Sequence, residues 1–496
     1  MPKIECRDHL LKTGRRRLPI GRAALGFGIA GALLGAAPAD AQTVYSNPEQ
    51  NSFYSSLLPP SHNELADQER LWWSLKKFPP QSNMHEVYWQ MPPDTPAFFR
   101  DSMLQYVARS YLLTRDNLNG TKSSAWAAGG WLAYRSGLIA DMFGVHAAFY
   151  TSQPLWAPID QDGTRLLAPG QKSIGVLGQI YGRIQIADQE IRIGRQLVDT
   201  PLINPQDNRM VPNTFEGGTL VSLPDPDRKY DYVVGYLTTM KARDSNDFIS
   251  MTDRLTDMDV VNRGAAFGMI RVRPLPGLSF VAMDYAVPGF INSSFGQVEY
   301  DFQQPKGMPN WIVGANVIGQ RSIGSDFVST PSFQTYQASG KVAMNYMGWT
   351  LFVAGSITGD GSFIYSPYGG KPTYTDMQQR SFDNAGEKAL GASAAYDVGS
   401  LFGISGLSTG IFYTQGWGLR NALTAVSIPD ERELDLWLQY RPSDGPLKGL
   451  RFKTQYGQIW QDGNVRSSSP EFRVIVDYTI LFRPPPPAAA PLVTKY

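Results

Sequence analysis

The most constraining feature of this sequence is a series of about eighteen strand-length segments between residues 102 and 482. They are rich in Tyr, Phe, Trp and β-branched residues, which favour strands. The connections alternate between short turns such as Met347-Gly348 and long loops such as 197–214 and 359–385. An even strand count with turns at one end and loops at the other predicts an all-β, antiparallel barrel, because closure leaves no unpaired edge strand.

Side-chain alternation predicts that the interior of this barrel is polar. Arg271 and Arg273 share one face of the segment 263–274 with other alternate residues, and Arg473 and Asp477 share one face of 472–482. An Arg or Lys at the middle of a bilayer costs about 2–4 kcal/mol, so these faces cannot contact lipid. The sequence therefore predicts a transmembrane β-barrel with a wet lumen.

The first 41 residues have the pattern of a cleaved signal peptide. A basic region precedes the apolar stretch 23–37, and Ala39-Asp40-Ala41 is typical of a cleavage site. After it, no apolar run approaches the roughly eighteen residues of a membrane helix. The single cysteine, Cys6, lies in the signal, so a disulfide-stapled fold is excluded. We expect a bacterial outer-membrane protein with both termini in the periplasm.

Two further segments flank the barrel, which we place at 99–482. Residues 42–98 form an N-terminal periplasmic extension, in which Ser61 and Glu64 make a capping box for a short helix over 61–78. Its role, as a plug of the pore or a periplasmic appendage, is left open. Residues 483–496 form a Pro-rich tail, so either Phe482 or Tyr496 is the C-terminal aromatic that would be presented to the barrel-assembly machinery.

Several function classes are excluded or disfavoured. Without the signal, 38 basic and 41 acidic residues remain of the totals of 45 and 44, which argues against nucleic-acid binding. The four His residues do not have metal-ligand spacing. Asp253, Asp257 and Asp259 could gather a divalent cation, but ordinary loop charges explain them equally. Gly406–Gly410 matches G-x-S-x-G, but it opens a predicted strand and no His follows Ser408, so we expect no enzyme and no cofactor.

Several stretches resemble the OprD-type family of substrate-specific outer-membrane porins. They are RSYLLTRD (109–116), WLAYRSG (131–137), IRIGRQLVDTPLINPQDNRMVPNTFEG (191–217), YGGKPTYTDMQQRSFDNAGEKALGASAAYD (368–397) and EFRVIVDY (471–478). The resemblance implies a monomeric barrel of eighteen strands. It also implies a third loop that folds inward, a seventh loop that helps it to narrow the pore, and a ladder of basic side chains on one wall.

Carried onto this sequence, the resemblance assigns three sets of site residues. The pore constriction in the third loop comprises Asp199, Asn204, Asp207, Asn208 and Arg209. The basic ladder comprises Arg183, Arg192, Arg195, Arg271, Arg273 and Lys341. The seventh loop lines the pore with Tyr365, Tyr368 and Arg380. As alternatives, the third-loop residues tie the loop to the wall, each arginine is a salt-bridged lumen residue without a role in selection, and the tyrosines pack within the loop or at the membrane interface.

The resemblance implies passive, substrate-selective diffusion of small carboxylate-bearing solutes, either basic amino acids or organic and aromatic acids. Arg can replace part of a carboxylate's hydration shell with planar, bidentate donors whose charge does not titrate. The expected partners are these solutes, outer-membrane lipid and lipopolysaccharide. Two alternatives are a sugar-selective porin, with an aromatic track in its lumen, and a barrel that acts mainly as a surface adhesin or scaffold.

Overall fold

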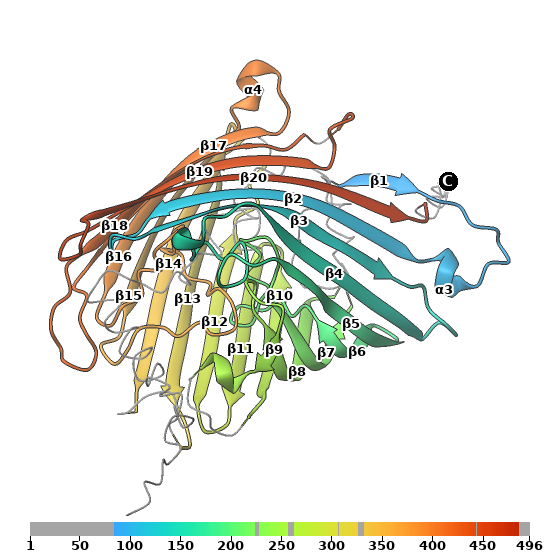
Figure 1. Ribbon diagram of the computed structural model, residues 1–496, viewed down its shortest axis with the longest axis horizontal. Coiled ribbons are helices and arrows are strands. Elements are labelled where there is room, and N and C mark those ends of the chain that lie inside the picture. The colour runs from blue at the N-terminus through green and yellow to red at the C-terminus, as the bar shows by residue number, and fades with distance from the viewer. Residues whose placement is uncertain are drawn as a thin grey trace, which may run out of the picture.

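In the computed structural model, eighteen antiparallel strands close into one barrel (Figure 1). The structure describes residues 84–223, 228–255, 262–305, 307–325, 332–442 and 444–485. The barrel strands are β2 (Met103–Asp116), β3 (Lys122–Arg135), β4 (Phe143–Trp156), β5 (Ile174–Ile186), β6 (Gln189–Gln196), β7 (Thr214–Ser222), β8 (Tyr230–Lys241), β10 (Ala265–Leu275), β11 (Leu278–Val287), β12 (Ile291–Asp301), β13 (Asn310–Ser322), β14 (Gln334–Tyr346), β15 (Trp349–Thr358), β16 (Lys388–Tyr396), β17 (Leu407–Trp417), β18 (Glu431–Tyr440), β19 (Leu450–Gln461) and β20 (Ser468–Arg483). The predicted transmembrane-type antiparallel barrel of about eighteen strands is confirmed.

The first and last barrel strands, β2 and β20, pair antiparallel and close the ring. Two short strands add to its rims: β1 (His85–Tyr88) pairs parallel with the end of β20, and β9 (Phe248–Ser250) pairs with β8. The few helical segments are α3 (Ala97–Arg100), α4 (Gly399–Phe402), η2 (Ile159–Gln161) and η3 (Thr252–Arg254). Among the described residues, no helix has the length and apolarity needed to span a membrane.

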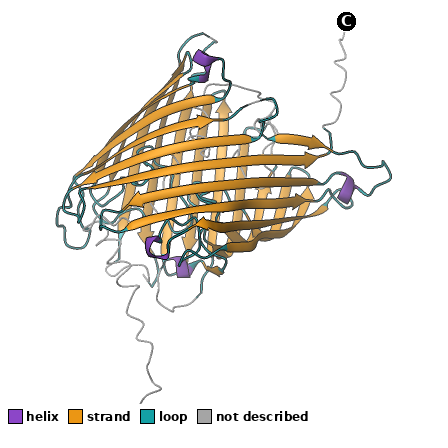
Figure 2. Ribbon diagram, turned by 45° about the horizontal axis from the view of Figure 1, so that its top comes forward, coloured by secondary structure: helices purple, strands orange, loops and turns teal. Residues whose placement is uncertain are grey.

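The long connections lie at one end of the barrel, as the sequence predicts. They include loop 2 (157–173), loop 3 (197–213), loop 4 (242–264) and loop 7 (359–387). The alternation is less strict than expected, because three connections at the same end are short: 117–121, 288–290 and 462–467. The strands form a continuous wall around the inward-lying loop segments (Figure 2).

Alternate residues of each strand face the lumen and the exterior. In β20, Arg473, Ile475, Asp477 and Thr479 are buried, whereas Phe472 on the other face is exposed. Arg271 and Arg273 share the inward face of β10 with Phe267 and Met269. The period of two is what places charged groups inside and apolar groups outside, as the sequence indicates.

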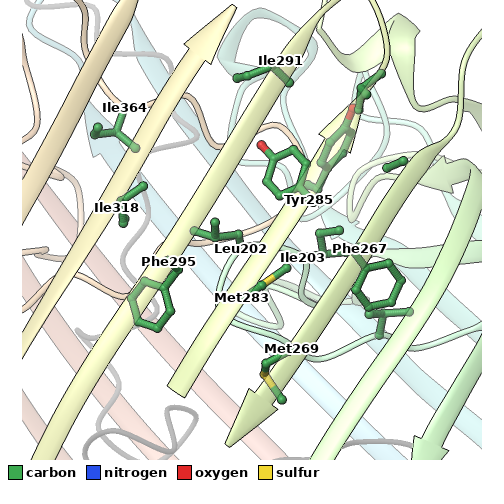
Figure 3. Packing of buried hydrophobic residues seen from close by; sticks show 14 of the residues in the cluster. Leu202, Ile203, Phe267, Met269, Met283, Tyr285, Ile291, Phe295, Ile318 and Ile364 are labelled. Carbon is green, nitrogen blue, oxygen red and sulfur yellow. The ribbon is translucent and has the colours of Figure 1, made fainter. Parts of the chain in front are cut away.

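The lumen is largely filled on one side by an apolar cluster. Leu202 and Ile203 of loop 3 lie among Met283, Tyr285 and other inward-facing side chains of β10 to β13 (Figure 3). Side chains of loop 7, including Tyr368 and Tyr374, belong to the same cluster. Burial of these groups fixes both loops against the wall, because about 25 cal/mol is gained per Å² of apolar surface removed from water.

Part of the N-terminal extension, from residue 84, lies along the rim beside the end of β20. Trp89 stacks on Phe482 with ring centroids 6.3 Å apart, and its backbone N–H donates to the carbonyl of Arg483 at 3.1 Å. The predicted signal peptide, the predicted helix over 61–78 and the tail from residue 486 lie outside the described residues. The domain boundaries stay predictions.

Candidate pore constriction and lumen wall

Loop 3 is fastened to the barrel wall by an ion pair at the β2–β20 seam. Asp207 binds Arg109 of β2 through two N···O contacts of 2.7 and 3.0 Å. The same guanidinium binds Asp477 of β20 at 2.7 Å and the backbone carbonyl of Arg209 at 2.6 Å. Arg109 and Asp477 are direct register partners, so the pairing of β2 with β20 places the carboxylate next to the guanidinium that holds loop 3.

Asn208 and Arg209 join loop 3 to its neighbouring loops. Arg209 is fully buried, and its Nε donates to the carbonyl of Thr164 in loop 2 at 2.8 Å. The carbonyl of Asn208 accepts a hydrogen bond from the hydroxyl of Tyr111 at 3.3 Å, and its Oδ1 accepts one from Arg243 of loop 4. Loops 2, 3 and 4 are thus bound into one unit at this end of the lumen.

Asn204 joins loop 3 to loop 7. Its Nδ2 donates to the carbonyl of Gly370 at 2.8 Å, and its Oδ1 accepts from the N–H of Gly370 at 2.9 Å. Its own N–H donates to the carbonyl of Tyr368 at 3.0 Å. Gly369, between them, has φ +146°, and a Cβ there would lie 2.4 Å from Asn204 Oδ1, so only glycine fits. Asp199, also predicted for the constriction, is buried in the same loop.

Loop 7 is held by carboxylates that project from β18. The backbone N–H of Gln378 donates to Asp435 at 2.9 Å, and those of Gln379 and Arg380 donate to Glu433 at 2.8 and 2.7 Å. The guanidinium of Arg380 lies 3.3 Å from Glu431. Glu431, Glu433 and Asp435 are alternate residues of one strand, so all three face the lumen.

Two carboxyl groups of loop 7 itself are fully buried. Burial raises the pKa of Glu387 well above its ordinary value, and the neighbouring Glu431 raises it further. Asn384 donates to Glu387 Oε2 through its N–H at 2.9 Å and its Nδ2 at 2.8 Å. Burial likewise raises the pKa of Asp376. Loop 7 therefore buries two carboxyl groups whose pKa values are raised, although the hydrogen bonds from Asn384 partly offset the rise at Glu387.

The two predicted tyrosines of loop 7 are packing residues in this conformation. Tyr368 is fully buried, donates its hydroxyl to the carbonyl of Met251 at 2.8 Å, and contacts the ring of Tyr285. Tyr365 packs against the apolar cluster, and both its N–H and its carbonyl bond to Gln320 at 2.8 Å. These contacts correspond to the loop-packing alternative.

Five cations follow the lumen face of three adjacent strands, and we call them the seam row. They are Arg109 and Arg115 on β2, Arg451 and Lys453 on β19, and Arg473 on β20. Successive levels of the row are two residues apart, or about 7 Å. Glu471 forms ion pairs with Arg115 at 3.3 Å and Arg473 at 2.6 Å, and Asp477 forms ion pairs with both Arg109 and Arg451. Cations therefore outnumber the β20 carboxylates along this wall.

A second cationic group surrounds Glu190 of β6. Arg192 lies 2.7 Å from this carboxylate, and Arg183 and Arg135 each lie 3.1 Å from it. Arg183 also donates to the carbonyl of Ser136 at 2.7 Å. The structure thus brings together Arg183 and Arg192 of the predicted ladder, and adds Arg135, which the ladder prediction does not include.

The remaining predicted ladder residues lie apart. Arg271 and Arg273 both bind Asp231 at 2.6 Å and are partly exposed. Lys341 binds Glu299 at 2.6 Å. The structure corrects the placement of Arg195: it shares the outward face of β6 with Ile193 and binds Glu216 at 3.5 Å, so it does not reach the lumen.

Other chemistry is not indicated in the described part of the chain. Within it, no group of three or more His, Cys, Asp or Glu side chains is arranged to hold a metal ion. Asp257 and Asp259 lie outside the described residues. Ser408 is the second residue of β17, in register with Gln439 of β18, so the G-x-S-x-G match lies in a strand and not in a strand–helix turn.

Comparison with known proteins agrees with this geometry. The model of the OprD family of outer membrane porins matches residues 96–482. The chain belongs to the OprD family. The resemblance drawn from the sequence is confirmed, the fold and family are those of channels and not of enzymes, and membership implies a bacterial outer-membrane location.

Individual relatives of this OprD-family chain are distant. The porin-like protein GalP of Pseudomonas putida is 23% identical over 398 residues, which cover 77% of this chain and 93% of that one. The structure of OpdK with vanillate, from Pseudomonas aeruginosa, has a TM-score of 0.68 and 22% identity, and covers 77% and 100% of the two chains. OccK2 (OpdF) of the same organism, in complex with glucuronate, has a TM-score of 0.65 and 19% identity over 77% and 99%. These likenesses show the shared fold.

The sequence-based assignment of the OprD-type ladder missed the seam row. Two local signals point to it: Arg451 and Lys453 alternate in β19, and Arg109 and Arg115 are an even number of residues apart in β2. The pairing that assembles these strands at the seam is not local, because Arg109 and Asp477 are 368 residues apart.

Proposed function

We propose that this OprD-family porin mediates passive diffusion of small solutes that bear a carboxylate. The observation that carries the proposal is the seam row, which places a guanidinium or ammonium group at successive levels about 7 Å apart down one wall. A carboxylate can move between such levels by exchanging one bidentate donor for the next.

The pairing within the row supports weak binding, which conduction requires. Each of Glu471 and Asp477 pairs with two arginines, so a solute carboxylate competes with a resident carboxylate at these arginines. A site of this kind attracts an anion without holding it. The carboxylates also keep the buried guanidinium groups compensated when no solute is present.

Loops 3 and 7 form the narrow part of the proposed path. The row is mostly buried, and Arg473 donates to the carbonyl of Gln378 in loop 7 at 3.1 Å. We infer that Asn204, Asp207, Asn208 and Arg209 frame the constriction by holding these loops, and that a passing solute shifts them. We place the barrel in the outer membrane with its long loops facing the cell exterior and both termini facing the periplasm.

The related porins support the class of solute. OpdK has been solved with vanillate, and OccK2 with glucuronate; both compounds bear a carboxylate. The partly exposed Arg271 and Arg273, at the end opposite to the long loops, offer a further carboxylate contact on leaving the lumen. We expect the carboxylate to contribute more to recognition by the pore than the rest of the solute does.

The test is osmotic swelling of proteoliposomes with solutes matched in size. Glucuronate and glucose differ in one carboxylate, so we expect wild-type vesicles to admit glucuronate faster. Arg473→Gln should lower the rate for glucuronate and leave that for glucose nearly unchanged, whereas Lys122→Gln, on the outward face, should change neither. Equal rates for the two solutes in wild-type vesicles would contradict carboxylate selection, and no swelling with any solute would favour a scaffold or adhesin.

A further inference from the structure

Charged residues on the outward face of the barrel gather at one end. In the described part of the barrel strands, they all lie within four residues of a strand end at the long-loop side: Asp116, Lys122, Arg195, Glu216, Asp284, Arg321, Lys388 and Arg432. The outward face at the opposite end carries aromatic groups, such as Tyr106, Trp311 and Trp349. Because both ends contact a membrane interface, this asymmetry indicates that the two leaflets differ in charge.

Two of these cations form a contiguous patch with tryptophans, which we call the β16–β19 patch. Lys388 of β16 is the register partner of Trp417 in β17. On the neighbouring strands Arg432 of β18 is the register partner of Trp460 in β19, and its guanidinium carbon lies 5.5 Å from the centre of that ring. Leu390 and Leu436, further along the same outward faces, are exposed apolar residues. The patch therefore caps a lipid-facing apolar surface.

Carboxylates of the described residues do not pair with the two cations of the patch. In the described residues, neither Lys388 nor Arg432 lies within ion-pair distance of a carboxylate, whereas outward Arg195 binds Glu216 and outward Asp116 binds Arg466 at 3.2 Å. Asp430, two residues before Arg432, accepts a hydrogen bond from the N–H of Gly418 at 3.2 Å. Two cations next to two tryptophans are thus available to an external anion.

We propose that the β16–β19 patch binds the phosphate groups of the phosphorylated glycolipid that forms the outer leaflet. The proposal rests on the orientation given above, in which the long loops face outward. Tryptophan prefers the level of the headgroups, Lys and Arg stems lie along apolar surface while their charged ends reach the interface, and Arg binds phosphate through bidentate donors. An anion free in solution would gain nothing from the apolar strands beneath.

The test is a binding titration of folded, full-length protein in neutral detergent with purified lipopolysaccharide. Lys388→Gln/Arg432→Gln should bind it about thirtyfold more weakly, since each basic residue near an anionic membrane surface contributes about 1 kcal/mol. Lys388→Arg/Arg432→Lys should bind as wild type does, because it keeps both charges. Arg195→Gln removes one outward cation at the same end that is already paired with Glu216, and should have no effect.

Three results would overturn the proposal. They are wild-type affinity in the double Gln variant, equal affinity of the wild-type protein for dephosphorylated lipopolysaccharide, and equally strong competition by phosphatidylglycerol. Folding of each variant is checked by the heat-dependent shift in gel mobility of β-barrels. Glucuronate swelling of the same preparation should be unchanged in the double Gln variant, so loss of lipid binding and loss of the channel are measured separately.

Discussion

Loops 3 and 7 meet inside the barrel, yet groups of opposite polarity hold them to its wall. The wall donates to loop 3, because Arg109 of β2 binds the carboxylate of Asp207. Loop 7 donates to the wall, because its backbone N–H groups at 378–380 bind Glu433 and Asp435 of β18. At the wall, loop 3 is therefore held through a buried charged pair and loop 7 mainly through hydrogen bonds to carboxylates, while both loops also make hydrogen bonds to neighbouring segments.

Because different contacts hold the two loops to the wall, substitutions should loosen them to different extents. Removal of one partner of a buried ion pair leaves an uncompensated charge, which costs several kcal/mol. Loss of one hydrogen bond among many costs about 1 kcal/mol. We therefore expect a single substitution at the charged pair to loosen loop 3 strongly, and loop 7 to loosen gradually with substitution or pH.

The largest effect is expected for Arg109→Ala. It leaves Asp207 buried without its cation, whereas Asp477 keeps Arg451, so we expect the free energy of unfolding to fall by about 3–5 kcal/mol and the segment around Asp207 to move away from the wall. Urea unfolding in lipid vesicles and single-channel conductance, which should rise, measure this. Arg273→Ala is the matched control, because Arg273 is partly exposed and Arg271 still binds Asp231. An equal effect in both variants would contradict the role of the seam.

Asn204→Ala should have the next largest effect, because at residue 204 it removes the side-chain hydrogen bonds between the two loops and leaves only the backbone bond to the carbonyl of Tyr368. The variant loses both hydrogen bonds with Gly370, so we expect a loss of about 2 kcal/mol in unfolding free energy. Current noise should increase as loops 3 and 7 move independently. Asn204→Asp keeps the hydrogen-bond acceptor but not the donor, so its current noise should lie between that of the wild type and that of Asn204→Ala. Wild-type noise in Asn204→Ala would show that other contacts hold the loops together.

Loop 7 should respond to pH through Glu387, whose pKa is raised in the folded protein by burial and by Glu431. The docked loop binds a proton that a solvated Glu has released, so docking is strongest at low pH and weakens as pH rises above the ordinary Glu range. The charge of Asp383 also raises the pKa of Glu387. Arg380 lies 3.3 Å from Glu431 and partly neutralises the charge that Glu431 places beside Glu387. Opening frequency should rise by at most about tenfold per pH unit.

The check is single-channel recording between about pH 5 and about pH 8. Glu387→Gln mimics the protonated carboxyl and should flatten the pH dependence, whereas Asp207→Asn in loop 3 should leave its slope in place. A fall in opening frequency with rising pH would contradict the sign of the effect.

The smallest effect is expected for Tyr368→Phe. The substitution removes only the hydrogen bond from the hydroxyl to the carbonyl of Met251, and the ring still packs against Tyr285. We expect a loss of about 1 kcal/mol in unfolding free energy and unchanged conductance. Tyr413→Phe serves as control, because it removes a hydroxyl hydrogen bond of similar kind, to Gln415 at 3.1 Å, on the exposed outward face of β17. A large change in conductance for Tyr368→Phe would restore the pore-lining role predicted from the sequence.

The barrel could be predicted from the sequence because its signals are local. Strand length, a period of two and turn residues are each contained in about ten neighbouring positions, and they locate all eighteen strands. The extra strands β1 and β9 were not predicted, because each is only a few residues long and is defined by its partner strand. Long loops could be located, but not the side chains that fasten them.

The candidate site was predictable only in part, for reasons that two arginines illustrate. Arg192 and Arg195 were both assigned to the ladder, but residues three apart in a strand lie on opposite faces, and Arg195 faces outward. Arg109 lies in the family-like stretch 109–116, but its role could not be predicted, because its partners Asp207 and Asp477 lie 98 and 368 residues away. Which arginines meet in the lumen depends on closure of the ring.

The most direct test of a carboxylate-selective pore is single-channel current through purified protein in a planar bilayer. We predict small, frequent openings that glucuronate or vanillate interrupts at concentrations where glucose has no effect. The same interruptions should become shorter in Arg473→Gln, because one level of the seam row is lost. No openings in folded protein, or equal interruption by glucuronate and glucose, would contradict the account.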